Sequence, residues 1–123
     1  MGNTKRTPHT GRSGEAAARR FIEKHLGMRV FETNFRSPTG EIDIIAWEGK
    51  TVVFFEVKSR ERLSAGLPEE SVTPRKQQKI RKTALAFLLK EGLNPHHTTC
   101  RFDVISIIYR SGDPQINHIP NAF

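Results

Sequence analysis

The period of the apolar positions changes several times along the chain, and each change marks a predicted element. Apolar residues recur four apart at Ala18, Ile22 and Leu26 and stop at a glycine, which predicts a helix over about residues 14–26. The next segment, residues 28–36, is rich in β-prone side chains and ends at the turn sequence SPTG, so it predicts a strand.

Two strongly apolar runs follow within residues 40–60, GEIDIIAWEGKTVVFFEVKSR, and predict a β-hairpin. The length of the turn decides the register. A two-residue loop EG sets Glu41 opposite Glu56, whereas a four-residue loop EGKT sets Asp43 opposite Glu56. A three-residue loop would put the acids of the two strands on opposite faces unless a bulge restored the alternation.

The polar segment RERLSAGLPEESV predicts an exposed, mobile loop. Thr73 followed by Pro74 then marks the start of a second helix, which ends at Gly92. An apolar stripe along this helix predicts the face that it buries: Ile80, Ala84, Phe87 and Leu88.

The last predicted elements are strands. Residues 101–109, RFDVISIIY, are too apolar for a one-sided strand, so this strand is expected to be central or covered on both faces. A short edge strand is expected over residues 115–119. The order of helix, three strands, helix and strand predicts an α/β fold with one mixed sheet flanked by helices. A chain of 123 residues suits a single domain, expected over residues 13–123 behind a flexible basic arm of residues 1–12.

Composition adds a partner class to this fold. The chain has 20 Lys and Arg against 13 Asp and Glu, a net charge of +7 and a pI near 10.1, which favours nucleic acid as the partner. No stretch approaches the roughly 20 apolar residues that span a bilayer, so no membrane association is expected. The absence of a secretory h-region and the single Cys100 indicate a cytoplasmic protein.

Charged side chains interrupt both apolar runs of the hairpin. Strand alternation divides the first run into two expected faces: Glu41, Asp43 and Ile45 against Ile42, Ile44 and Ala46. Either the two-residue or the four-residue loop puts Asp43 on one face with Glu56 and Lys58. Glu15, three residues before Ala18 on the stripe of the first helix, is expected to tilt toward the same sheet.

Two or three acids against one ammonium leave an excess of negative charge, which a divalent cation would neutralise. Oxygen ligands favour Mg²⁺ or Mn²⁺, and a lysine beside them suits phosphodiester hydrolysis. The alternative is a solvent-facing strand pair in which Glu56 and Lys58 form a simple ion pair.

Four blocks of sequence carry a resemblance to a known family: GEAAA at residues 14–18, the GEID segment, FEVKSR and SVTPRKQQKIRK. An acid on one strand followed by Glu-X-Lys on the next looks like the motif of the PD-(D/E)XK nuclease superfamily. Together the blocks resemble the YraN family of predicted endonucleases, which are similar to archaeal Holliday junction resolvases. The resemblance covers roughly residues 11–110 and implies a restriction-endonuclease-like α-β-β-β-α-β core.

The resemblance also implies an activity. It suggests a Mg²⁺- or Mn²⁺-dependent endonuclease that hydrolyses phosphodiester bonds in DNA, with branched or otherwise structured DNA as one expected substrate. Asp43 and Glu56 would be metal ligands, and the backbone carbonyl of Val57 a further one. Lys58 would serve the attacking water or the transition state, and Glu15 matches the acid of the first helix in the resolvase-like branch.

The remaining charges of these blocks have less definite roles. Glu41 would bind metal, bind substrate or support the hairpin. On the second helix, the resemblance puts Lys76 and Gln77 near the phosphate or the attacking water, and several further basic residues would track the DNA backbone: Arg75, Lys79 and Lys82. A homodimer is one expected assembly, because related nucleases must cut two strands.

Two rival hypotheses stay open beside the nuclease. One is a non-catalytic nucleic-acid-binding protein on a nuclease-like scaffold. The other is a structural or adaptor role, in which the charges of the hairpin form an internal ion-pair network.

Overall fold

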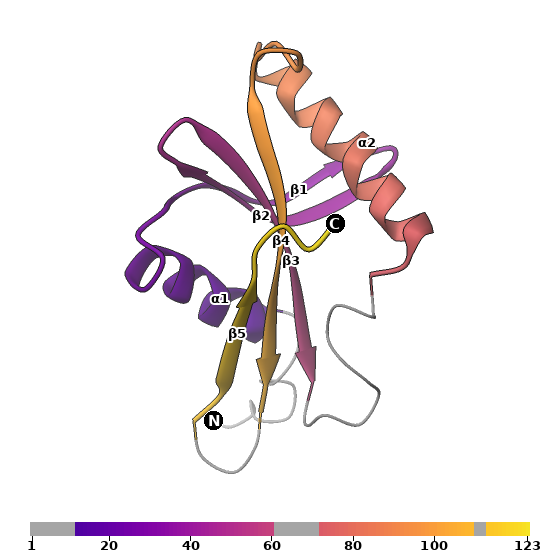
Figure 1. The fold of residues 1–123 in the computed structure, drawn as a ribbon. Coiled ribbons are helices and arrows are strands. Elements are labelled where there is room, and N and C mark those ends of the chain that lie inside the picture. Colours follow the sequence, from indigo (N-terminus) through magenta and orange to yellow (C-terminus); the bar gives the residue numbers. More distant parts are fainter. Residues whose placement is uncertain (1–11, 61–71, 110–112) are drawn as a thin grey trace.

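The computed structural model describes residues 12–60, 72–109 and 113–123. One mixed five-stranded sheet, in the order β1-β2-β3-β4-β5, lies between two helices (Figure 1). Only the β3–β4 pairing is parallel. Along the chain the elements are α1 Arg12–Lys24, β1 Arg29–Ser37, β2 Gly40–Glu48, β3 Thr51–Arg60, α2 Pro74–Lys90, β4 Thr99–Ile108 and β5 Gln115–Ile119.

The predicted α/β order is therefore confirmed. The first helix begins and ends about two residues earlier than predicted, and Arg12, assigned to the basic arm, already belongs to α1. The rest of the predicted arm and most of the predicted mobile loop lie outside the described residues. Neither α1 nor α2, the helices within the described ranges, is long and apolar enough to cross a membrane.

Two separate apolar clusters hold the helices to opposite faces of the sheet. On one face, α1 contributes Ala18 and Ile22, which pack with Ile44, Phe55 and Ile105. All five are fully or almost fully buried. The burial of a large apolar side chain stabilises a fold by about 1.5–3 kcal/mol, so this cluster holds α1 against the strands.

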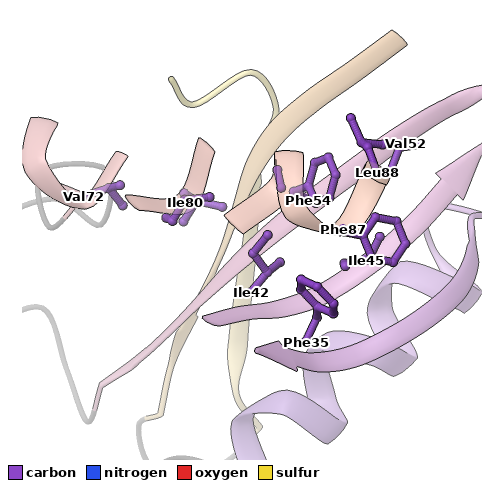
Figure 2. Packing of buried hydrophobic residues seen from close by; sticks show 11 residues of the cluster. Phe35, Ile42, Ile45, Val52, Phe54, Val72, Ile80, Phe87 and Leu88 are labelled. Carbon is purple, nitrogen blue, oxygen red and sulfur yellow. The ribbon is translucent and has the colours of Figure 1, made fainter. Parts of the chain in front are cut away.

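The other cluster lies between α2 and the sheet. Figure 2 shows Phe87 and Ile80 of α2 directed at Phe35, Ile42 and Phe54. Phe87 makes edge-to-face contacts with both Phe35 and Phe54, at centroid distances of 5.3 and 5.9 Å. The predicted buried face of the second helix is confirmed.

Capping fixes where α2 begins, as its sequence predicts. The Thr73 hydroxyl accepts a hydrogen bond from the Lys76 amide at 3.2 Å, and Pro74 occupies the first helical position. A second anchor joins α2 to the β1–β2 turn, where Thr83 and Thr39 share a hydrogen bond of 2.9 Å between their hydroxyls. The middle of α2 is thereby held beside the turn that leads into β2.

The β2–β3 turn has the register of the longer predicted loop. Trp47 pairs with Val52, and a further pair of Glu48 with Thr51 leaves only two residues in the turn itself. Gly49 adopts a φ of +61°, a left-handed conformation that a tight turn requires and glycine accepts without strain. This register directs Asp43 toward Glu56.

Strict alternation fails in β2, and this part of the sequence prediction is wrong. Ile42 was expected on one face with Ile44, yet Ile42 packs in the α2 cluster with Ile45 while Ile44 packs in the α1 cluster. The β2–β3 pairing also ends at Ile44 and Phe55. The residues of β2 that precede Ile44 pair only with β1, and the residues of β3 that follow Phe55 pair only with β4. The sheet therefore forks between β2 and β3 (Figure 1).

Candidate functional site

The fork in the sheet opens a cleft of about 250 Å³ beside the first turns of α2. Its lining combines carboxylates from the two diverging strands with ammonium groups from the helix: Gly40, Glu41, Asp43, Glu56, Lys76, Lys79 and Ile80. Three of the four sequence-predicted acids and two of the predicted basic residues thus meet in one place.

Three carboxylates converge at the β2 side of the cleft. Oxygen atoms of Glu15, Glu41 and Asp43 all lie within 4.8 Å of one another. The prediction that Glu15 tilts from α1 toward the sheet acids is confirmed. Glu41 is exposed and its charge is partly balanced by Arg36, at 3.6 Å.

Asp43 is the most perturbed of these acids. Burial raises its pKa from an ordinary 3.8 to about 7, and the neighbouring charges of Glu56, Glu15 and Glu41 act in the same direction. A hydrogen bond of 2.8 Å from the Val57 amide to Asp43 Oδ2 opposes this shift. The cluster therefore holds more negative charge than its surroundings compensate, which is a condition that a bound cation would relieve.

Glu56 has a different environment, although it lines the same cleft. Its side chain is almost buried and its Oε2 atom lies 2.6 Å from Lys76 Nζ and 3.5 Å from Lys58 Nζ. It is not a member of the three-carboxylate cluster. Two ammonium groups thus balance Glu56, while Asp43 forms no ion pair among the described contacts.

The two lysines differ in how firmly they hold their protons. Burial lowers the pKa of Lys58 below its ordinary value, and the adjacent charge of Lys76 lowers it further. Burial acts against the charge of Lys76 as well. The hydrogen bond to Glu56, the contact with Lys58 and the negative charges of Glu56 and Asp43 together outweigh it and raise the pKa of Lys76. Lys76 is therefore the firm counter-charge of Glu56, and Lys58 is the ammonium that loses a proton more readily.

The other residues of α2 that were predicted to contact nucleic acid divide into three groups. Lys79 lines the cleft, and Arg75 borders an adjoining depression together with Lys76 and Lys79. Gln77 instead donates a hydrogen bond of 3.0 Å to the Val72 carbonyl, so it supports the start of the helix rather than facing the cleft. Lys82 is exposed and does not line the cleft.

Comparison with known proteins places this site in a family. Residues 14–107 match a family described as the uncharacterised protein family UPF0102. The chain belongs to the UPF0102 family. It is 47% identical over 113 residues to a UPF0102 protein of Geobacter metallireducens, covering 92% of this chain and 90% of the relative. It is also 42% identical over 125 residues to a UPF0102 protein of Bifidobacterium longum subsp. infantis, covering the whole of both chains.

UPF0102 is the YraN family that the sequence motifs resemble, so that identification is confirmed. The matched region contains all the residues that line the cleft as well as Glu15 and Lys58. Its description gives no activity, and neither do the names of these relatives.

One residue beside the UPF0102 site escaped the sequence analysis. Asn34, in β1, donates a hydrogen bond of 3.0 Å from Nδ2 to Glu15 Oε1. Its φ of +55° is left-handed. Asn is disfavoured in strands and is the ordinary residue most tolerant of this conformation, so its presence in FETNFR was the available signal.

Proposed function

We propose that this UPF0102 protein is a divalent-cation-dependent endonuclease that hydrolyses phosphodiester bonds in DNA. The supporting observation is that carboxylates of β2 and β3 share one cleft with ammonium groups from the start of α2. Carboxylates attract a hard cation and ammonium groups attract a phosphate. A phosphodiester that is cleaved with the help of a metal ion requires both.

The donor set fits Mg²⁺ or Mn²⁺. Glu15, Glu41 and Asp43 offer only oxygen atoms, which these ions prefer, and the raised pKa of Asp43 is typical of carboxylates that lack a cation. Glu56 and the Val57 carbonyl are further proposed ligands. When bound, the ion would lower the pKa of a coordinated water and stabilise charge on the phosphorane.

The protein's own groups would then bind the substrate and stabilise the charge of the transition state. Lys58, beside Glu56, would orient the attacking water or stabilise the transition state. Lys79 and Arg75 are exposed at and beside the cleft, where they would bind phosphates flanking the cleaved bond, with Lys82 further along the same helix. A homodimer belongs to this proposal, because two sites would be needed to cut both strands of a duplex.

A cleavage panel tests the proposal. Single-stranded, duplex, flap and four-way-junction DNA are incubated with the protein in Mg²⁺ or Mn²⁺, beside the variants Asp43→Asn and Asp113→Asn. Asp113 is exposed and does not line the cleft, so its variant controls for the loss of one negative charge. Cleavage of at least one substrate that is lost only in Asp43→Asn is the expected result, and DNA binding is retained in both variants. Cleavage that survives in Asp43→Asn would refute the site.

The charge balance of Glu56 favours a second candidate function. Because Lys58 and Lys76 already neutralise Glu56, the cleft has a stable arrangement with no metal at that carboxylate. A non-catalytic nucleic-acid-binding protein would use the same basic residues. It is distinguished by salt-sensitive binding to DNA or RNA without cleavage of any substrate in either metal.

A further inference from the structure

Asn34 has a backbone conformation that its position in a strand does not explain. Among the described residues other than glycine, only Asn34 and Asn121 have a positive φ, at +55° and +51°. A side chain in this conformation costs free energy, and glycine is the residue that avoids the cost. Asn34 is exposed, so packing does not require its side chain either.

The distortion lies directly beside the candidate site. The β1–β2 register pairs Thr33 with Ile44 and Phe35 with Ile42, and it omits the intervening pair of Asn34 and Asp43. At this same point β2 changes which side chains face which helix. The positive φ of Asn34 in β1 therefore lies at the same level of the sheet as the change of faces in β2 that turns Asp43 toward β3.

The side chain of Asn34 is directed at the acid cluster. Its Nδ2 atom donates to Glu15 Oε1 at 3.0 Å, and Glu15 is the only member of the three-carboxylate cluster that comes from α1. An amide orients a carboxylate without adding a positive charge. A lysine or arginine here would neutralise Glu15 and compete with a cation, whereas Asn34 leaves the full negative charge available.

The backbone at position 34 thus favours glycine or asparagine, and the hydrogen bond to Glu15 requires asparagine. We propose that Asn34 is a positioning residue, which holds the Glu15 carboxylate in place for the divalent cation at the fork. This inference rests on the proposed function. It predicts that the side chain of Asn34 matters for the cation site and not for folding.

The variant Asn34→Gly separates these two roles, because glycine accepts the backbone conformation and removes the amide. Asn121→Gly is a matched control, with the same backbone change outside the cleft. Mn²⁺ binding is measured by isothermal titration calorimetry on the full chain, and urea unfolding without metal measures stability. Asn34→Gly is expected to keep the stability of the unmodified protein and to bind Mn²⁺ about tenfold more weakly, as is usual when a partner of a metal ligand is removed. Asn121→Gly is expected to bind Mn²⁺ normally.

A double variant tests whether Asn34 acts through Glu15. In the background of Glu15→Ala, the change Asn34→Gly is expected to cause no further loss of Mn²⁺ affinity. An additive loss in the double variant, or unchanged Mn²⁺ affinity in Asn34→Gly alone, would overturn the role of Asn34 and leave the proposed function standing. An unmodified protein that binds no Mn²⁺ would overturn both.

Discussion

The ammonium of Lys76 lies 2.6 Å from the Glu56 carboxylate, so the first turn of α2 is joined to β3 across the cleft. Lys58 approaches the same carboxylate from its own strand, at 3.5 Å. Three further acids lie at the other side of the cleft with only Arg36 as a described ionic partner, at Glu41. The site is therefore divided into a balanced carboxylate and an unbalanced carboxylate cluster.

This division predicts that Lys76 competes with a cation for Glu56. In Lys76→Gln the Glu56 oxygen loses its nearest counter-charge, so Mn²⁺ should bind severalfold more tightly in calorimetry. DNA binding should weaken at the same time, because one phosphate-facing charge is lost, and the slope of log K against log salt should become shallower by about 0.9. Lys50→Gln is the control, since Lys50 is exposed in the β2–β3 turn, at the opposite end of β2 from the fork. Mn²⁺ affinity that does not rise in Lys76→Gln would show that Glu56 takes no part in binding the ion.

The raised pKa of Asp43 predicts that the site destabilises the fold at neutral pH. An acid whose pKa is higher in the folded state binds its proton more tightly there, so the free energy of unfolding falls as pH rises through the window between about 4 and 7. The full shift corresponds to at most about 4 kcal/mol. The variant Asp43→Asn removes this cost and should be more stable than the unmodified protein at pH 7.5, by an amount that disappears below pH 4.

Urea unfolding at pH 4, 5.5 and 7.5 measures this effect, with Asp113→Asn as the charge-matched control. Saturating Mn²⁺ at pH 7.5 should reduce the difference between Asp43→Asn and the unmodified protein, because an ion that binds only the folded state adds about 2.7 kcal/mol at a hundred times its dissociation constant. If Asp43→Asn is instead the less stable protein at pH 7.5 without metal, the carboxylates form a structural network, as the adaptor hypothesis requires.

Much of this fold follows from local patterns in the sequence. Thr73 and Pro74 fix the start of α2 because a cap and a pre-set φ act within one turn. The apolar run of β4 predicts a central strand or one covered on both faces. Its pairing with β3 on one edge and β5 on the other, and the burial of consecutive residues along it, agree with both. These features depend on residues that are close together in the sequence, so local sequence patterns are enough to predict them.

The sequence was enough to name most residues of the site, but not to predict how they are arranged. The motif and the alternation of side chains along a strand were enough to assign the acids to one site. Alternation assumes a regular strand, however, and β2 is irregular at Asp43, where the sheet forks. The pairing of Lys76 with Glu56 depends on how α2 crosses the sheet, which the Thr83–Thr39 contact and the Phe87 packing help to set. Contacts between residues so distant in sequence carry no local signature.

The close approach of α1 to β3 predicts that substitutions of Gly14 and Ser59 have coupled effects on Mn²⁺ binding and stability. A Cβ atom on Gly14 would overlap the Ser59 hydroxyl, so glycine allows the first turn of α1, and with it Glu15, to approach the sheet. Gly14→Ala should therefore weaken Mn²⁺ binding and lower the free energy of unfolding, although alanine favours a helix by about 1 kcal/mol. Ser59→Ala should restore both in the double variant, since the contacts that then remain, 3.4 Å to the Cβ of residue 59 and 3.9 Å to Ile107 Cδ1, are ordinary ones. Additive losses in calorimetry and urea unfolding would contradict this account of Gly14.

A second network of charges, whose members do not line the cleft, predicts a loss of stability without a loss of metal binding. Asp103 is completely buried and accepts hydrogen bonds from Arg101 at 3.0 Å and from the Asn121 amide at 3.0 Å, with His118 at 2.7 Å. Asp103→Ala would leave the Arg101 charge, at a largely buried site, without its buried partner, and breaking such a pair costs about 3–5 kcal/mol.

Urea unfolding of Asp103→Ala should show this loss, while Glu48→Ala, which removes the exposed partner of the same arginine, should cost less than about 1 kcal/mol. Both variants should bind Mn²⁺ as the unmodified protein does at a temperature where they are folded, because neither residue lines the cleft. This result would assign the charges of β4 and β5 to folding and those of the fork to the cation. Reduced Mn²⁺ affinity in a folded Asp103→Ala variant would show instead that the two networks are coupled through β3.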